Sequence, residues 1–183
     1  NNSYYSSSYN YINFRLAIES PMANGQQSLF VACAGNNGAN LDTNPYIFPA
    51  SFNSPNIITV AASDNYDNLC YWSNIGKNTI DLSAPGEAFI QTPQIGSGNY
   101  GGNYGSELSC AFVSGTAALL KSLYPDITAD QMKAAILESV DKKTSLENKV
   151  LSGGRLNVYR ALFPFDVSGI TPLQFYSDQY GSG

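Results

Sequence analysis

The stretch Ser28-Leu-Phe-Val-Ala-Cys33 is a short, continuous run of mostly apolar residues, and the glycine and asparagine cluster Gly35-Asn-Asn-Gly38 follows it. A run of this length, bounded by turn residues, predicts a buried strand of the kind found in parallel sheets. Ile57 to Ala62 and Thr79 to Ser83 have the same character. Strands separated by helices and long loops indicate the α/β class, with a mostly parallel sheet flanked by helices.

Three segments carry helical patterns. The first runs through Tyr11 to Ile18. The second, Ser106 to Tyr124, has apolar residues spaced so that the helix is expected to be buried on nearly all sides, and Pro125 ends it. The third begins at a capping box formed by Thr128 and Gln131, and it is expected to bury one face. That face comprises Met132, Ala135, Ile136 and Val140.

Composition restricts the classes of function. The 183 residues, of which 43% are hydrophobic, suffice for one compact domain. Only 13% are charged and the net charge is -5, which disfavours nucleic-acid binding. No apolar run approaches the roughly 20 residues of a membrane-spanning helix. Histidine is absent, so this chain taken alone holds no complete Ser/His/Asp triad.

The ends and one internal stretch differ in character from the rest. Asn1 to Asn10 is polar, with no visible signal peptide. Gly96 to Gly105 is nearly all Gly, Ser, Asn and Tyr, which predicts a loop. Residues 1–162 are expected to form the folded unit and residues 163–183 an extension or linker. The three cysteines fit no metal-binding spacing. We expect them to be buried free thiols, with one disulfide and one unpaired thiol as the alternative. They are Cys33, Cys70 and Cys110.

Three segments, in order, resemble the C-terminal half of the subtilisin-like serine protease domain (subtilase, peptidase S8). Val31-Ala-Cys-Ala-Gly-Asn36 is similar to the family's Ala-Ala-Gly-Asn strand end. The second segment, Phe48 to Gly86, resembles the family's next landmarks at Phe48-Pro-Ala50, Ile57 to Ala62, Tyr71-Trp-Ser-Asn-Ile-Gly76 and Asp81-Leu-Ser-Ala-Pro-Gly86. Gly105-Ser-Glu-Leu-Ser-Cys-Ala-Phe-Val-Ser-Gly115 is similar to Gly-Thr-Ser-Met-Ala-x-Pro-His-Val-Ala-Gly. The resemblance implies a three-layer subtilisin-like fold of which this chain supplies the second half.

Glu107 stands where the family has its nucleophilic serine. A serine there loses its proton to a neighbouring imidazole and forms an acyl intermediate. A carboxylate is a poor substitute, because it is a weak nucleophile in acyl transfer and adds negative charge where negative charge must develop. The family's proline and histidine nearby are Ala111 and Phe112. Shifting the register to use Ser106 or Ser109 would break both flanking glycine matches.

Asn36 matches the family's oxyanion donor. Taken without the resemblance, Asn36 is an ordinary turn residue and Glu107 an acidic residue that the helix dipole favours. With the resemblance, the Glu107 carboxylate is expected near the Asn36 amide, where it would fill the former oxyanion space.

The start of the chain resembles the family's substrate-pairing strand. Ser3, Tyr4 and Tyr5 fall on that strand, and Tyr5 replaces a glycine that lets the substrate approach. The family's Asp and His would lie upstream. An expected partner is therefore the N-terminal half of the same domain, either as a separate chain or as sequence that precedes this segment.

The leading hypothesis is a catalytically inactive subtilisin-like domain that serves as a structural or protein-interaction module in a secreted or surface assembly. One alternative is an active endopeptidase with unrecognised catalytic residues, and another is a structural component of an extracellular filament. Two interpretations fit the tyrosines near the former groove equally well: a binding surface and an ordinary polar surface. These residues are Tyr4, Tyr5, Tyr9, Tyr100 and Tyr104. Calcium is a conceivable cofactor through Asp42, Asp64 and Asp67, although these residues form no recognisable ligand pattern.

Overall fold

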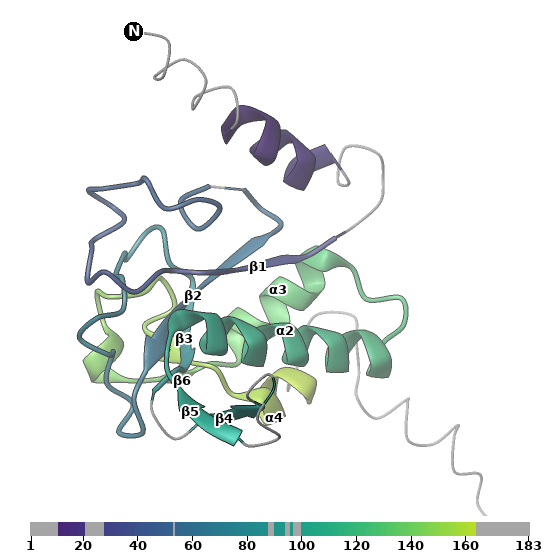
Figure 1. Ribbon diagram of the computed structural model, residues 1–183. Helices are drawn as coiled ribbons and strands as arrows, with labels where there is room; N and C mark the ends of the chain where they lie inside the picture. Colours follow the sequence, from purple (N-terminus) through teal and green to yellow (C-terminus); the bar gives the residue numbers. More distant parts are fainter. Residues whose placement is uncertain are drawn as a thin grey trace, which may run out of the picture.

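A computed structural model describes residues 11–20, 28–52, 54–87, 90–93, 96 and 100–163. Its main sheet has the order β1-β2-β3-β7-β6 (Figure 1). The first four of these strands pair in parallel, and β6 runs antiparallel to β7. The strands are β1 (Phe30–Cys33), β2 (Ile57–Ser63), β3 (Leu82–Pro85), β6 (Asp141–Lys142) and β7 (Gly154–Arg155). The mostly parallel sheet confirms the expected α/β class.

Helices and loops cover the two faces of this sheet and make three layers. On one face, α2 (Ser106–Leu123) and α3 (Ala129–Glu138) pack on alternate residues of β2, such as Ile58 and Val60, and α4 (Val158–Leu162) lies beside them. The helix at residues 11–20 lies on the other face (Figure 1). It buries Ile18 against Ala32 and Ile57. All seven residues of β2 are buried, since both faces of this interior strand are covered.

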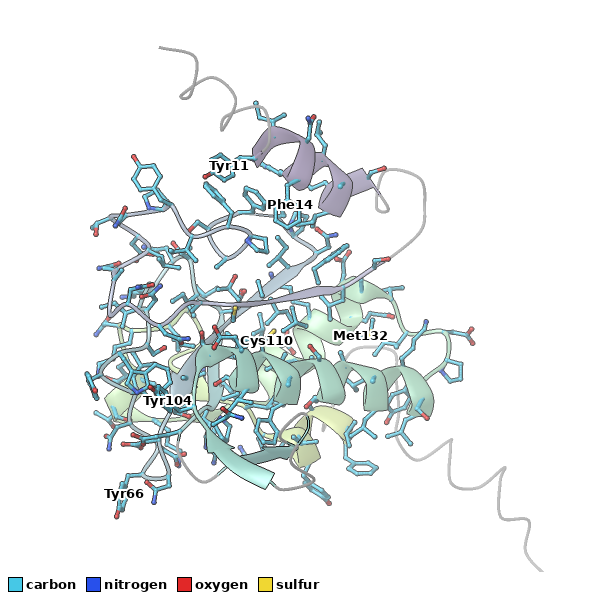
Figure 2. All side chains as sticks on the ribbon, viewed as in Figure 1. Tyr11, Phe14, Tyr66, Tyr104, Cys110 and Met132 are labelled. Atoms are coloured by element: carbon cyan, nitrogen blue, oxygen red, sulfur yellow. The ribbon has the colours of Figure 1, made fainter. Side chains whose placement is uncertain are left out.

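All three predicted helices are present, at residues 11–20, in α2 and in α3. The first covers residues 11–20, where the Tyr11 and Phe14 rings contact those of Phe48 and Phe52 (Figure 2). The capping box at the start of α3 is also present, with Thr128 Oγ1 accepting from the Gln131 backbone N–H and the Gln131 side chain accepting from the Thr128 N–H. The expected apolar face of this segment is buried.

The predicted strand at Thr79 to Ser83 was wrong in its first half, since β3 begins only at Leu82. Residues 77–79 form a turn instead. The Asp42 carboxylate holds that turn by accepting hydrogen bonds from the Asn78 backbone N–H and the Thr79 hydroxyl. A contact between residues so far apart in sequence is invisible to a local pattern.

The loop predicted for Gly96 to Gly105 was also wrong in part. Tyr100–Asn103 forms β5, which pairs antiparallel with β4 (Ile90–Pro93) in a separate two-stranded sheet. A ladder is made by backbone N–H and C=O groups, so a glycine-rich segment with no alternating apolar pattern can still join one.

The prediction that the second helix is buried on nearly all sides is contradicted. Val113 and Leu120 of α2 are buried against the sheet, whereas Phe112 and Leu119 on the opposite face are 43% and 49% exposed. The spacing shows that the helix is apolar all round, but the described residues cover only one side of it.

The predictions for the ends of the chain fall mostly outside the described residues: Asn1 to Asn10, and the expected extension at 163–183 beyond Phe163. Within the part of the chain that the structure describes, no helix is both long and apolar enough to cross a bilayer.

Candidate functional site

The loop that follows β1 carries Asn36 and is fixed in place by the buried side chain of Asn74. The Asn74 Nδ2 donates to the carbonyl of Ala34 at 2.7 Å, and its Oδ1 accepts from the backbone N–H groups of Asn37 and Ala39 at 3.1 and 2.8 Å. Gly35 has φ +95°, and a Cβ there would lie 2.7 Å from Asn74 Nδ2. The loop therefore needs both residue types to present Asn36 at the carboxyl end of the strand.

The N-terminus of α2 is held against the same loop. Ser106 is fully buried, and its backbone N–H and its hydroxyl both donate to Asn36 Oδ1 at 2.9 Å. The Ser106 Oγ in turn accepts from the Gly35 N–H at 3.0 Å. Ser109, one turn later, donates to the carbonyl of Ala84 at 2.9 Å, which ties the helix to the end of β3. These hydrogen bonds fix the oxygen of the Asn36 amide, and the orientation of the amide NH₂ group is therefore fixed as well.

That NH₂ group points at Glu107. Asn36 Nδ2 lies 3.0 Å from Oε1 and 2.8 Å from Oε2 of the carboxylate. Glu107 occupies the first turn of α2, where backbone N–H groups and the helix dipole favour a negative charge. The structure brings together the two side chains expected to meet, and both are exposed at the rim of the site.

Gly105, the residue before α2, makes room for this arrangement. Its φ is +149°, a backbone conformation that residues with a Cβ rarely adopt. A Cβ there would also overlap Glu107 Oε2. Chemically, the ionised Glu107 side chain is only an acceptor, and it already occupies the donor that Asn36 offers.

The two cysteines beside this site, Cys33 in β1 and Cys110 in α2, are half-buried, whereas Cys70 is buried; all three are free thiols in the structure. Cys110 lies on the side of α2 that faces β1, with Sγ 3.2 Å from the carbonyl oxygen of Val31 (Figure 2). The expectation of buried free thiols thus fits Cys70 best.

The tyrosine surface is described only in part. The Tyr104 ring, 70% exposed, lies 5.7 Å from that of Trp72 just before α2 (Figure 2). Only the backbone of Tyr100 is described. The other residues expected along the groove lie outside the described part of the chain: Ser3, Tyr4, Tyr5 and Tyr9.

The three aspartates considered for calcium are already engaged by protein donors. Asp42 accepts from Asn78 and Thr79. Asp64 accepts from backbone N–H groups of its own turn, and Asp67 forms ion pairs with Lys143 and Arg155. Across the described ranges, no group of three or more His, Cys, Asp or Glu residues is placed to hold a metal ion.

Two positioning residues escaped the sequence reasoning. Asn74 fixes the loop and Ser106 the helix start. The sequence patterns placed Asn74 only within a motif and considered Ser106 only as a rejected nucleophile, so neither positioning role was predicted. Asn74 lies within the motif Ser73-Asn-Ile-Gly76, and Ser106 directly follows Gly105. These positions were the signal that could have identified the two residues.

The model of the subtilase family (peptidase S8) matches residues 1–155. The chain belongs to the subtilase family. It is 30% identical over 178 residues to the A-subunit of the subtilase cytotoxin of Escherichia coli, an alignment that covers 85% of this subtilase and 50% of the relative. It is 35% identical over 135 residues to a thermophilic serine proteinase of Bacillus sp. strain AK1, covering 74% of this chain and 31% of that one.

Solved structures agree with this assignment. The A-subunit of the AB5 toxin from E. coli superposes with a TM-score of 0.72 at 29% identity, covering 83% of this subtilase and 56% of that chain. A lanthipeptide protease, at 23% identity and a TM-score of 0.64, shares the fold. This subtilase thus spans about half the length of the toxin protein that it matches.

Proposed function

We propose that this subtilase segment belongs to a catalytic domain that no longer cleaves peptides, and that it serves as a structural or protein-interaction module. The observation that carries the proposal is the contact of the Glu107 carboxylate with the Asn36 amide at 2.8 and 3.0 Å. By the sequence resemblance, these two positions belong to the nucleophile and to the oxyanion donor.

The chemistry of that contact opposes acyl transfer in two ways. A carboxylate at the nucleophile position does not give the alkoxide-like attack that serine gives beside a base. It also places a permanent negative charge on the donor that would stabilise the oxyanion of a tetrahedral intermediate. Ser106 holds the Asn36 amide in this direction, and Asn74 fixes the backbone of the loop that carries it, so the contact is built into the loop.

The partner we propose first is the N-terminal half of the same domain. The exposed face of α2 borders a shallow groove of about 680 Å³ lined almost entirely by apolar side chains, including Ala111, Phe112 and Leu119. The chain spans about half of the toxin protein that it matches. A second half of comparable size is an occupant large enough to cover this face, and its arrival would enclose α2.

A secreted or surface location belongs to the same proposal. One relative is part of a cytotoxin, and a solved structure of that toxin describes its assembly. For this subtilase, export and assembly are expectations that cell fractionation with an antibody would test: recovery in the cytosolic fraction alone would exclude them.

A fluorophosphonate probe tests the loss of peptidase activity in the full-length gene product. We expect no labelling of the native protein, because no serine stands at position 107. The variant Glu107→Ser tests whether the rest of the site can still support labelling of a serine at this position. Glu107→Ser combined with Asn36→Ala is its control for the oxyanion donor. Labelling or peptide cleavage by the native protein that Glu107→Ala abolishes would overturn the proposal.

A further inference from the structure

The two half-buried cysteines beside Glu107 lie on facing elements. In β1, side chains alternate between the two faces of the sheet. Ala32 joins the cluster on the face covered by the helix at residues 11–20, while Val31 packs toward α2 and α3. Cys33, two residues after Val31, therefore points to the α2 side.

Cys110 approaches the same strand from the opposite direction. Its Sγ donates to the carbonyl of Val31 at 3.2 Å. Ser106 lies one helical turn before Cys110 on the same face of α2, and its hydroxyl accepts from the backbone N–H of Gly35, two residues after Cys33, at 3.0 Å. The end of β1 at Cys33 thus lies against the turn of α2 that ends at Cys110.

We propose that Cys33 and Cys110 form a reversible disulfide that links β1 to α2, and that Cys70 takes no part in it. The geometric ground is that both side chains occupy the same β1–α2 interface, while Cys70 is 4% exposed and lies after the turn that follows β2. Because Asn36 follows β1 and Glu107 begins α2, such a bridge would fix the two elements that carry the site. The proposal does not depend on whether the protein is a peptidase.

The causes of the pKa shifts of the three thiols agree with this placement. Burial raises the pKa of Cys110 to about 11, and the charge of the neighbouring Cys33 contributes next. Burial, and then the charge of Glu107, raise the pKa of Cys33 above its ordinary value. Burial raises the pKa of Cys70 to about 12, and the charges that add to it come from Glu87 and Asp64.

The oxidant we name is a low-molecular-weight disulfide such as oxidised glutathione. One thiol, after losing its proton, attacks the external S–S bond, forms a mixed disulfide and releases one glutathione thiolate. The second cysteine, also deprotonated, then attacks the protein sulfur of the mixed disulfide and releases the second glutathione. Two protein thiols are oxidised to one disulfide, one external disulfide is reduced to two thiols, and the two protons pass to the released glutathione.

The test uses the full-length protein, reduced and then equilibrated with oxidised glutathione. After quenching in acid and alkylation with N-ethylmaleimide, a non-reducing digest is analysed by mass spectrometry. We expect one linked pair of peptides that contain Cys33 and Cys110, about 2 Da lighter than the sum of the two reduced peptides, because two thiol hydrogens are lost. Cys70 should be recovered as the free thiol. Cys70→Ser is the matched control and should keep the linkage, whereas Cys33→Ser and Cys110→Ser should each lose it.

A second measurement guards against variants that fail to fold. Oxidation should raise the melting temperature of the native protein and of Cys70→Ala, while Cys33→Ala and Cys110→Ala should show no such rise. The proposal is overturned if Cys33 and Cys110 both remain alkylated, if each stops at the mixed disulfide with glutathione, or if the linkage involves Cys70.

Discussion

Asn36 and Glu107 lie 71 residues apart in the sequence, yet the single Nδ2 of Asn36 is within hydrogen-bonding distance of both carboxylate oxygens of Glu107. The Asn36 Oδ1 receives two hydrogen bonds from Ser106 at the same time. One amide therefore joins the end of β1 to the start of α2 through both of its polar atoms.

A double-mutant cycle measures this contact. Asn36→Ala and Glu107→Ala should be non-additive in the free energy of unfolding, with a coupling of about 0.5–1.5 kcal/mol for an exposed hydrogen bond. Glu107→Gln keeps an acceptor without the charge and should retain part of the coupling. Single-mutant effects that simply add would show that the contact contributes nothing to stability.

Gly105→Ala should be destabilising by about 1–3 kcal/mol, because φ +149° is strained for alanine. The added Cβ would also push the Glu107 carboxylate away from Asn36. Gly96→Ala is the matched control, since Gly96 has φ +84° but nothing within 4 Å of its Cβ position. Chemical denaturation of both variants should show a larger loss at Gly105, and equal losses would remove the steric part of the explanation.

Phe112→Ala should reveal whether protein covers the exposed face of α2 in the full-length product. If the N-terminal half packs there, the substitution should lower the free energy of unfolding by about 3 kcal/mol, as it does for a buried phenylalanine. If this face of α2 stays exposed to water, the free energy of unfolding should change by no more than about 0.5 kcal/mol. Tyr71→Ala is the comparison, since Tyr71 is 92% exposed; similar small losses for both variants would contradict the proposed partner.

Asp67 should make folding sensitive to acid. Burial raises its pKa, but the hydrogen bond from Lys143 and the charges of Arg155 and Lys143 outweigh burial, so the pKa lies below its ordinary 3.8. Its stabilising contribution is therefore present above pH 3.8 and is lost as the pH falls through the lowered value.

Asp67→Asn tests that pH dependence without adding backbone strain, because asparagine tolerates the positive φ of 63° at this position. Unfolding measured from neutral pH into acid should show the native protein more stable at neutral pH and the two proteins converging as the native carboxyl is protonated. A constant difference across this range would mean that the Asp67 charge is not responsible.

Much of the α/β architecture could be predicted because its signals are local. Apolar runs give β1 and β2, and Thr128 with Gln131 begins α3, since strand burial and helix capping depend on residues close in sequence. The β4–β5 hairpin and the late start of β3 escaped prediction, because backbone pairing and the distant Asp42 carboxylate decide them.

By itself, the sequence determined which residues are available at the site: a carboxylate at position 107, an amide at position 36 and no histidine anywhere in these 183 residues. Only the tertiary structure decided that the carboxylate and the amide meet, that Ser106 orients the amide, and that Asn74 fixes the loop that carries it. The physical reason is that hydrogen bonds act over about 3 Å in space, whereas the groups that form this site come from three segments that only the packing of α2 and the loops against the sheet brings together.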